Sequence, residues 1–390
     1  MLPARVATVK RGLCAATAAA LPSVAGIVHD HNESIKLRPM IIQQPLPRLV
    51  STALWTLILS VTFFVLVVGQ SLLIPLVLTL FLWYMINLLA GLFGRVQLAG
   101  HRLPSSLCFL LSGASLLFAI VLVVNMVTSN LAAVIEAAPG YQANLTRMLD
   151  DLMTRFEIEE PVDFGQLFGN INLRFIIQAV AASIGSLLGN AGLILVYLLF
   201  LFLEQRYFRH KLESIAPNPE RQQEILGLLS KIDTDIRTYV GIKTFVSALT
   251  ATVSWIIMKF IGLDFAEFWA VMIFVLNFIP NIGSLAATVL PSLLALVQFD
   301  TLGPFLAIVI GVGATQALVG NLLEPNLMGK SLNVSPLVIM LSLVLWGFIW
   351  GIPGMFLCVP ITVIAMIVLY HFDNTRWIAL MLSRDGQIKS

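Results

Sequence analysis

The sequence is poor in charge. Only 11% of its 390 residues are Asp, Glu, Lys or Arg, whereas 58% are hydrophobic. A soluble protein of this length carries about twice that charged fraction, so the composition excludes an ordinary soluble fold. Long apolar runs without alternating polar residues also exclude an outer-membrane β-barrel. The composition is typical of an all-α polytopic membrane protein.

Groups that carry enzyme chemistry are also scarce. The sequence contains no His-Glu-x-x-His and no Gly-x-Ser-x-Gly motif, so it shows neither a zinc-protease cage nor a serine nucleophile. The cysteines are far apart and match no metal or redox spacing. We therefore expect no metal site, no cofactor and no enzymatic activity. The cysteines are Cys14, Cys108 and Cys358.

Apolar and polar stretches alternate along the chain and predict about eight membrane segments. The stretch before the first span is basic and is expected to be disordered, and Met40 is an alternative start of translation. The predicted segments are a tail (1–48), three spans (49–128), an extracytoplasmic amphipathic segment (129–172), a long fourth span (173–203), a cytoplasmic amphipathic segment (204–241), a transport core (242–370) and a cytoplasmic tail (371–390).

The distribution of basic residues predicts the orientation. The tail 1–48 and the segment 204–241 each contain six Lys or Arg, whereas the segment 129–172 contains two, against seven acids. Cytoplasmic loops of membrane proteins are enriched in Lys and Arg. We therefore expect both termini in the cytoplasm and the segment 129–172 outside.

Two of the apolar runs are interrupted. Asn277–Gly283 breaks the run Phe265–Val297, and Trp350–Gly354 breaks the run Val334–Tyr370. Proline and glycine disrupt helices, and non-helical backbone at membrane depth must be buried in protein or line a wet cavity. The predicted loop positions make one broken hairpin enter from outside and the other from inside. That is the layout of an inverted repeat; two unrelated proline-kinked hairpins are the alternative.

The polar and small residues at the two breaks and in the span between them are the candidate solute path. The sequence shows no chain of carboxylates across the membrane, which argues against a proton relay and favours a neutral, hydroxyl-rich solute. The alternative is that the amides only cap broken helix ends. The candidates are Asn277, Pro280, Asn281, Gly283, Ser284, Gln316, Asn321, Gly351, Pro353 and Gly354.

Local geometry refines these candidates. The half-helices that start near Gly283 and Pro353 are expected to present free amides and partial positive charge to a polar group. Asn277 and Asn281 would share one helix face if the helix persisted between them.

Charged residues are a second group of candidates. Glu324, Asp264 and Glu267 are either ion-coupling groups or interfacial acids in contact with water. Lys243 and Lys259 are expected to be structural and to extend their ammonium groups toward the interface.

Two apolar stripes at helical spacing, Tyr141–Phe156 and Ile225–Val240, predict amphipathic helices. They are expected to pack on the membrane domain or on a neighbouring subunit. We therefore expect a homo-oligomer. The other expected partners are the lipid bilayer and a small solute or cation, and we expect no nucleic acid.

A series of short motifs in the second half of the chain resembles one known family. The series runs from Gly262-Leu263-Asp264-Phe265 through Asn277-Phe278-Ile279-Pro280-Asn281 and Glu324-Pro325-Asn326 to Gly351-Ile352-Pro353-Gly354. It is similar to that of the autoinducer-2 exporter family of permease-like bacterial inner-membrane proteins, over roughly 48–370. The resemblance implies a homo-oligomeric, non-enzymatic transporter that exports autoinducer-2 or exchanges sodium for protons. A non-transporting membrane scaffold is the third hypothesis.

Overall fold

The computed structural model describes residues 48–95, 97–98, 101–155, 185, 189–215, 218–328 and 333–386. The chain divides into two units, Met1–Thr62 and Phe63–Ser390. The described part of the first unit, residues 48–62, belongs to helix α2 (Arg48–Val68). The predicted tail, most of the segment 129–172 beyond residue 155 and the start of the predicted fourth span lie outside the described residues.

The described part of the second unit is almost entirely helical, which confirms the predicted all-α polytopic membrane protein. The described residues contain six helices that are long and apolar enough to cross a membrane, together with four shorter apolar helices. A two-residue antiparallel ladder, β1 (Gln97–Leu98) with β2 (His101–Arg102), connects α3 (Gln70–Phe93) to α4 (Ser105–Arg155).

Two helices continue past the boundaries that hydropathy suggested. α4 spans 51 residues, and its apolar part ends near Asn130. α8 (Pro219–Ile261) spans 43 residues and passes the expected boundary at 241 without interruption. A helix satisfies its own backbone hydrogen bonds in water and in lipid alike, so a change in hydropathy marks a change of solvent and not a helix end.

Local signals set the ends of α8. Pro219 occupies the first turn, where a missing N–H costs nothing. Gly262 has a φ of 86°, and its N–H bonds to the carbonyls of Met258 and Lys259 while the Leu263 N–H also bonds to Met258. This left-handed glycine cap satisfies carbonyls that the helix end leaves free.

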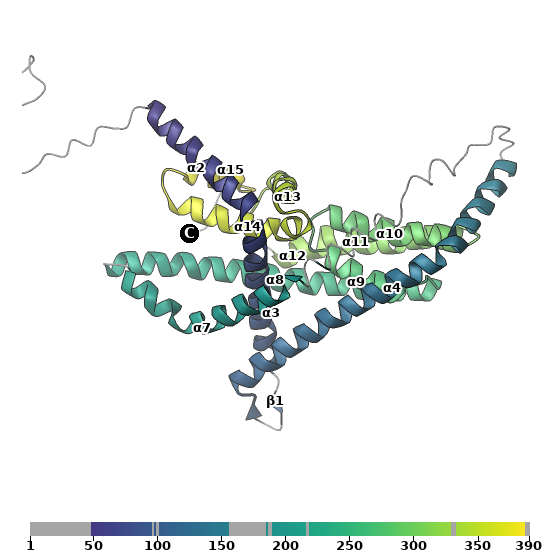
Figure 1. Ribbon diagram of the computed structural model, residues 1–390, viewed down its shortest axis with the longest axis horizontal. Helices are drawn as coiled ribbons and strands as arrows, with labels where there is room; N and C mark the ends of the chain where they lie inside the picture. The colour runs from purple at the N-terminus through teal and green to yellow at the C-terminus, as the bar shows by residue number, and fades with distance from the viewer. Residues whose placement is uncertain are drawn as a thin grey trace, which may run out of the picture. The chain divides into compact units, whose positions relative to one another are not determined.

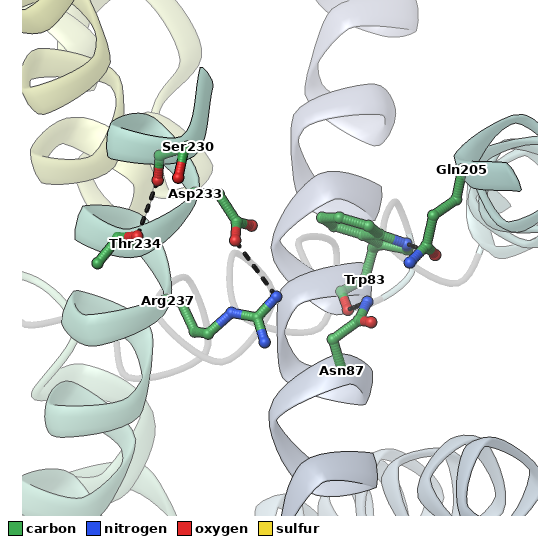
Figure 2. Close-up of polar contacts among 7 residues, drawn as sticks. All are labelled: Trp83, Asn87, Gln205, Ser230, Asp233, Thr234 and Arg237. Atoms are coloured by element: carbon green, nitrogen blue, oxygen red, sulfur yellow. Dashed lines mark hydrogen bonds and ion pairs between the residues drawn. The ribbon is translucent and has the colours of Figure 1, made fainter. Parts of the chain in front are cut away.

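The first half of α8 uses its two faces differently. Ile236 and Val240 are buried in a core shared with α3, α13 and α14, so part of the stripe Ile225–Val240 packs within the chain. On another face, Arg237 pairs with Asp233 at 3.4 Å, and its side chain points toward α3 (Figure 2). On α3, Trp83 donates to Gln205 of α7 (Ala191–Ile215) at 3.1 Å.

Both interrupted runs fold as pairs of helices. α9 (Ala266–Leu276) is followed by α10 (Ile282–Gln298), and α13 (Pro336–Trp350) by α14 (Ile352–His371). Between the pairs lie α11 (Leu302–Leu318), a π-helical turn η1 (Val319–Leu323) and α12 (Glu324–Met328). α9 is about 16 Å long and cannot alone cross a hydrocarbon core of about 30 Å.

The helices of the second unit enclose two hydrophobic cores. One core includes buried residues of α3, α8, α13 and α14, and the other includes residues of α8, α9, α10 and α11. α8 belongs to both cores; it packs along α9, α11 and α14, and Figure 1 shows it as one long helix. The first break and the π turn η1 lie next to the apolar second half of α8.

The chain after α14 is structured as well. α15 (Arg376–Leu382) packs on α14. Val334 forms an antiparallel bridge with Ser383, and the Ser335 N–H bonds to the Leu382 carbonyl at 3.0 Å. The segment predicted as a polar tail thus holds the beginning of α13.

Candidate functional site

The first break lies at the edge of a cavity of about 230 Å³. The cavity is lined by α8, the loop between α9 and α10, the start of α10, the end of α11 and the π turn η1. Its volume lies below the about 300–1,000 Å³ of typical drug-sized ligand sites, so it fits only a small solute. The lining residues are Lys243, Val246, Thr250, Asn277, Ile279, Pro280, Asn281, Ser284, Gln316, Ala317, Gly320, Asn321 and Glu324.

The structure therefore brings together most of the candidates predicted around the first break. Asn277, Pro280, Asn281 and Ser284 reach the cavity from the loop and from α10, and Gln316, Asn321 and Glu324 reach it from the span that follows. Whether these residues contact a solute stays a prediction.

Two amides connect the break to α11. Gln316 Nε2 donates a hydrogen bond to Asn277 Oδ1 at 3.0 Å, and Asn277 is only 8% exposed. The Asn277 backbone ends α9 in a helical conformation, with its N–H bonded to the Ile273 carbonyl. A buried amide needs such partners, so Asn277 both supports the break and presents polar atoms to the cavity.

The helix does not persist to Asn281, so the condition under which Asn277 and Asn281 would share a helix face is not met. Asn281 has a φ of 56°, a left-handed value that Asn tolerates better than most residues. Its side chain is exposed, with Nδ2 at 3.0 Å from Met340 Sδ. Pro280 removes one donor and helps to turn the chain between the two asparagines.

The amides after the first break are not free. The Ile282 N–H bonds to the Pro280 carbonyl at 2.6 Å, and the Gly283 N–H bonds to the Ile279 carbonyl at 3.1 Å. The expectation that the start of α10 presents unpaired N–H groups to a solute is therefore wrong for these two residues. These backbone N–H groups are hydrogen-bonded within the loop, so the polar groups that line the cavity here belong to side chains.

The two glycines inside the broken hairpins have a packing role. A Cβ on Gly283 would lie 1.8 Å from the Leu276 carbonyl oxygen, and a Cβ on Gly354 would lie 2.0 Å from the Trp346 carbonyl oxygen. Both glycines are buried, and neither lines the cavity. Only a residue without Cβ lets each second helix begin so close to the end of the first.

The second break lies apart from the cavity lining. Gly351 bridges α13 and α14 with a φ of 65°, and Pro353 sits in the first turn of α14, as predicted. Phe356 of α14 stacks on Phe278 at 4.8 Å between ring centroids, and both rings contact Phe81 of α3 edge-on. An aromatic cluster thus joins the two breaks.

The charged residues at the cavity form an ion pair. Lys243 Nζ lies 2.6 Å from Glu324 Oε1, and the side chains are 10% and 19% exposed. The expectation that Lys243 extends to the interface is therefore wrong. Glu324 follows directly after η1, and π turns inside α-helices occur often at functional sites.

The other two acids do not reach the cavity. Glu267 pairs with Lys259 at 2.7 Å, and both side chains are at least half exposed. Asp264 accepts a hydrogen bond from Tyr141 at 3.1 Å, and its backbone N–H bonds to Gln298. Burial and the bond to Asp264 raise the pKa of Tyr141 to about 12, so the phenol stays a donor. Both acids thus hold the junction of α8 with α9.

Sequence reasoning missed part of the α8 wall. Lys243, Val246 and Thr250 reach the cavity, and their spacing of three and four residues places them on one helix face. From the sequence alone, this spacing could have identified the three residues as cavity-lining only if the elements that pack against this face of α8 were known. Gly320 also lines the cavity, and a Cβ there would meet no atom of the described residues within 4 Å.

Known proteins are similar to this chain in sequence over the region that contains the cavity. Residues 54–374 match the profile of the AI-2E family transporter. A putative transport protein of Borreliella burgdorferi is 33% identical over 252 residues, which are 64% of this chain and 68% of that protein. The AI-2 transport protein TqsA of Escherichia coli K12 is 27% identical over 319 residues, 81% of this chain and 90% of that protein.

A second Escherichia coli K12 relative, the putative transport protein YhhT, is 26% identical over 334 residues, 83% of this chain and 90% of that protein. The family match covers the cavity and both broken hairpins. The resemblance inferred from the motifs is confirmed, and these names give the scaffold hypothesis no support. The chain belongs to the AI-2E transporter family and is a multi-pass membrane transporter.

Proposed function

We propose that the protein exports a small, uncharged, hydroxyl-bearing solute of the autoinducer-2 type, and that the solute binds in the cavity at the first break. One observation carries the proposal: the polar wall consists of neutral groups, and the charges that reach it, Lys243 and Glu324, neutralise each other. The printed name of TqsA supports the choice of solute.

The chemistry of the wall suits such a solute. Asn281, Gln316 and Asn321 carry amides that both donate and accept, and Thr250 and Ser284 add hydroxyls. A solute with several hydroxyls can exchange its water hydrogen bonds for these groups, which offsets the cost of leaving water. A charged solute would need a counter-charge, and the pair already uses both charges.

Asn321→Leu is the sharpest variant for a test. Asn321 is exposed and lines the cavity, so its replacement removes a polar group without opening the core. Asn277→Leu leaves Gln316 without its partner, and Asn281→Leu places a less tolerant residue at a positive φ. Both of those changes mix stability with recognition.

The experiment measures uptake of labelled neutral, hydroxylated solutes, including autoinducer-2, into proteoliposomes. Asn321→Leu should lower the flux or change its selectivity while the protein still inserts and unfolds at the wild-type temperature. Gln205→Leu is the matched control, because Gln205 bonds to Trp83 away from the cavity. Wild-type selectivity in Asn321→Leu would contradict the proposal.

Cation/proton antiport is the second candidate, because the Glu324 carboxylate reaches the cavity. Glu324→Gln separates the two functions. Antiport should be lost in Glu324→Gln, whereas the flux of a neutral solute should persist. We also propose the setting expected from the sequence: a homo-oligomer in a bacterial inner membrane with both termini in the cytoplasm.

A further inference from the structure

The polar wall of the cavity is made of the oxygen ligands that hard cations prefer, yet its carboxylate already has a cationic partner from the chain itself. Glu324 Oε1 lies 2.6 Å from the Lys243 ammonium. Thr250, Gln316 and Asn321, whose side chains carry hydroxyl or amide oxygens, line the same space. Carboxylates, carbonyls and water are the usual ligands of hard ions.

We propose that Lys243 is a tethered cation that occupies a latent monovalent-cation site on Glu324, and that it thereby sets the selectivity of the cavity against Na⁺ and K⁺. The inference deepens the proposed function and rests on it for the cavity being the solute site. Removing the ammonium should convert the cavity into a site for an alkali cation.

Because the pair is buried, Lys243 should hold its position on Glu324 tightly. The two side chains are 10% and 19% exposed, so each charge has lost most of its water. Breaking such a pair from one side leaves a buried charge without compensation. Glu324 without Lys243 must therefore recruit another cation or a proton, and at alkaline pH the ion is favoured.

The surroundings of the carboxylate add a further oxygen. Tyr239 lies one turn from Lys243 on α8, is 3% exposed, and its hydroxyl has no hydrogen-bond partner among the described residues. A buried hydroxyl without a partner is unusual, and Tyr239 therefore leaves one unused oxygen on α8 a single turn before Lys243.

The donor set suits a monovalent ion. The described residues contain no group of three or more His, Cys, Asp or Glu side chains that could hold a metal. One carboxylate with neutral oxygens balances a single positive charge, which is the charge that Lys243 supplies. The ion class is therefore Na⁺ or K⁺ and not a divalent or transition metal.

The test is a thermal-unfolding measurement on the full-length protein in detergent at alkaline pH. NaCl is compared with N-methylglucamine chloride at equal ionic strength. In Lys243→Gln, Na⁺ should raise the Tm by about 2 °C, the scale expected for a chain of this length when the ion exceeds its dissociation constant about tenfold. The rise should be absent in the wild type and in Lys243→Gln/Glu324→Gln.

Lys259→Gln is the matched control. Lys259 lies on the same helix and also pairs with a glutamate at 2.7 Å, but the two side chains are 61% and 50% exposed. Water can solvate Glu267 after the change, so Na⁺ should give no specific shift. A Na⁺ shift of equal size in Lys259→Gln and Lys243→Gln would overturn the inference, as would no shift in Lys243→Gln.

The wild type supplies a second test if Lys243→Gln does not fold. The inference requires that Na⁺ leave the Tm of the wild type unchanged. A Na⁺-specific rise in the wild type that Glu324→Gln abolishes would overturn it, because the site would then be open with Lys243 in place. None of these measurements uses the transported solute, so a failure here is distinct from a failure of the proposed function.

Discussion

Gly283→Ala tests whether Gly283 is needed for the close contact between α9 and α10 or instead lines the solute path. The added Cβ would lie 1.8 Å from the carbonyl oxygen and 2.7 Å from the carbonyl carbon of Leu276. Both atoms belong to the backbone, so no side-chain rotation relieves the contact. The start of α10 must move away from the end of α9.

The size of the effect follows from that geometry. Overpacking against side chains that can shift costs about 1–3 kcal/mol. Because a backbone carbonyl cannot shift alone, we expect Gly283→Ala to cost about 3 kcal/mol or more, a fall in Tm of about 4 °C or more for a chain of this length. Gly354→Ala should behave alike, since its Cβ would lie 2.0 Å from the Trp346 carbonyl oxygen.

Gly320→Ala is the comparison. A Cβ at Gly320 meets no described atom within 4 Å and points into open space at the cavity. Alanine is a better helix former than glycine by about 1 kcal/mol, so the Tm should stay the same or rise. Solute flux should change in Gly320→Ala, because the methyl group enters the cavity.

The assay combines thermal unfolding in detergent with solute uptake in proteoliposomes. We expect Gly283→Ala to lower the Tm, while the protein that still folds keeps the wild-type solute selectivity. We expect Gly320→Ala to keep the wild-type Tm and to change the solute flux. Wild-type stability of Gly283→Ala would refute the close approach of α9 and α10 on which the packing role rests.

Three other predictions follow from separate features. Deleting 376–390 should make the loop before α13 more sensitive to protease, because α15 and the strand-like bridge after it hold that loop; unchanged cleavage in limited proteolysis would contradict this. Trp350→Phe removes an indole donor 3.0 Å from a carbonyl of α2 and should lower the stability by about 1 kcal/mol, measured as a small fall in Tm. An impermeant thiol reagent added from outside should label Glu160→Cys and not Arg221→Cys; the reverse pattern contradicts the orientation.

The breaks were predictable because they violate the rules of an apolar helix. Proline, glycine and amides inside the run 265–297 conflict with a continuous membrane helix, and the structure interrupts the helix there, between Leu276 and Ile282. Gln316 and Asn321 were predictable candidates for a similar reason, since polar side chains inside a span need partners or water.

The roles of individual residues were harder to predict, because they depend on what faces them. Lys243 and Glu324 are 81 positions apart, and no local pattern pairs them. Gly283 and Gly320 look equivalent in the sequence, yet one faces a backbone carbonyl and the other a cavity. The length of α8 was missed because hydropathy reports the surrounding solvent and not the continuity of the helix.

The central claim is that a solute occupies the cavity at the first break, and protection of a cysteine placed there tests it most directly. In a protein with its native cysteines replaced, Asn321→Cys should react with an aqueous thiol reagent. Ile310→Cys, on the outward surface of α11 with 67% exposure, should stay unreactive in the bilayer, because reagents of this kind need water. The transported solute should slow the labelling of Asn321→Cys in a saturable manner. Labelling at an unchanged rate in the presence of a solute that the protein demonstrably transports would contradict the account.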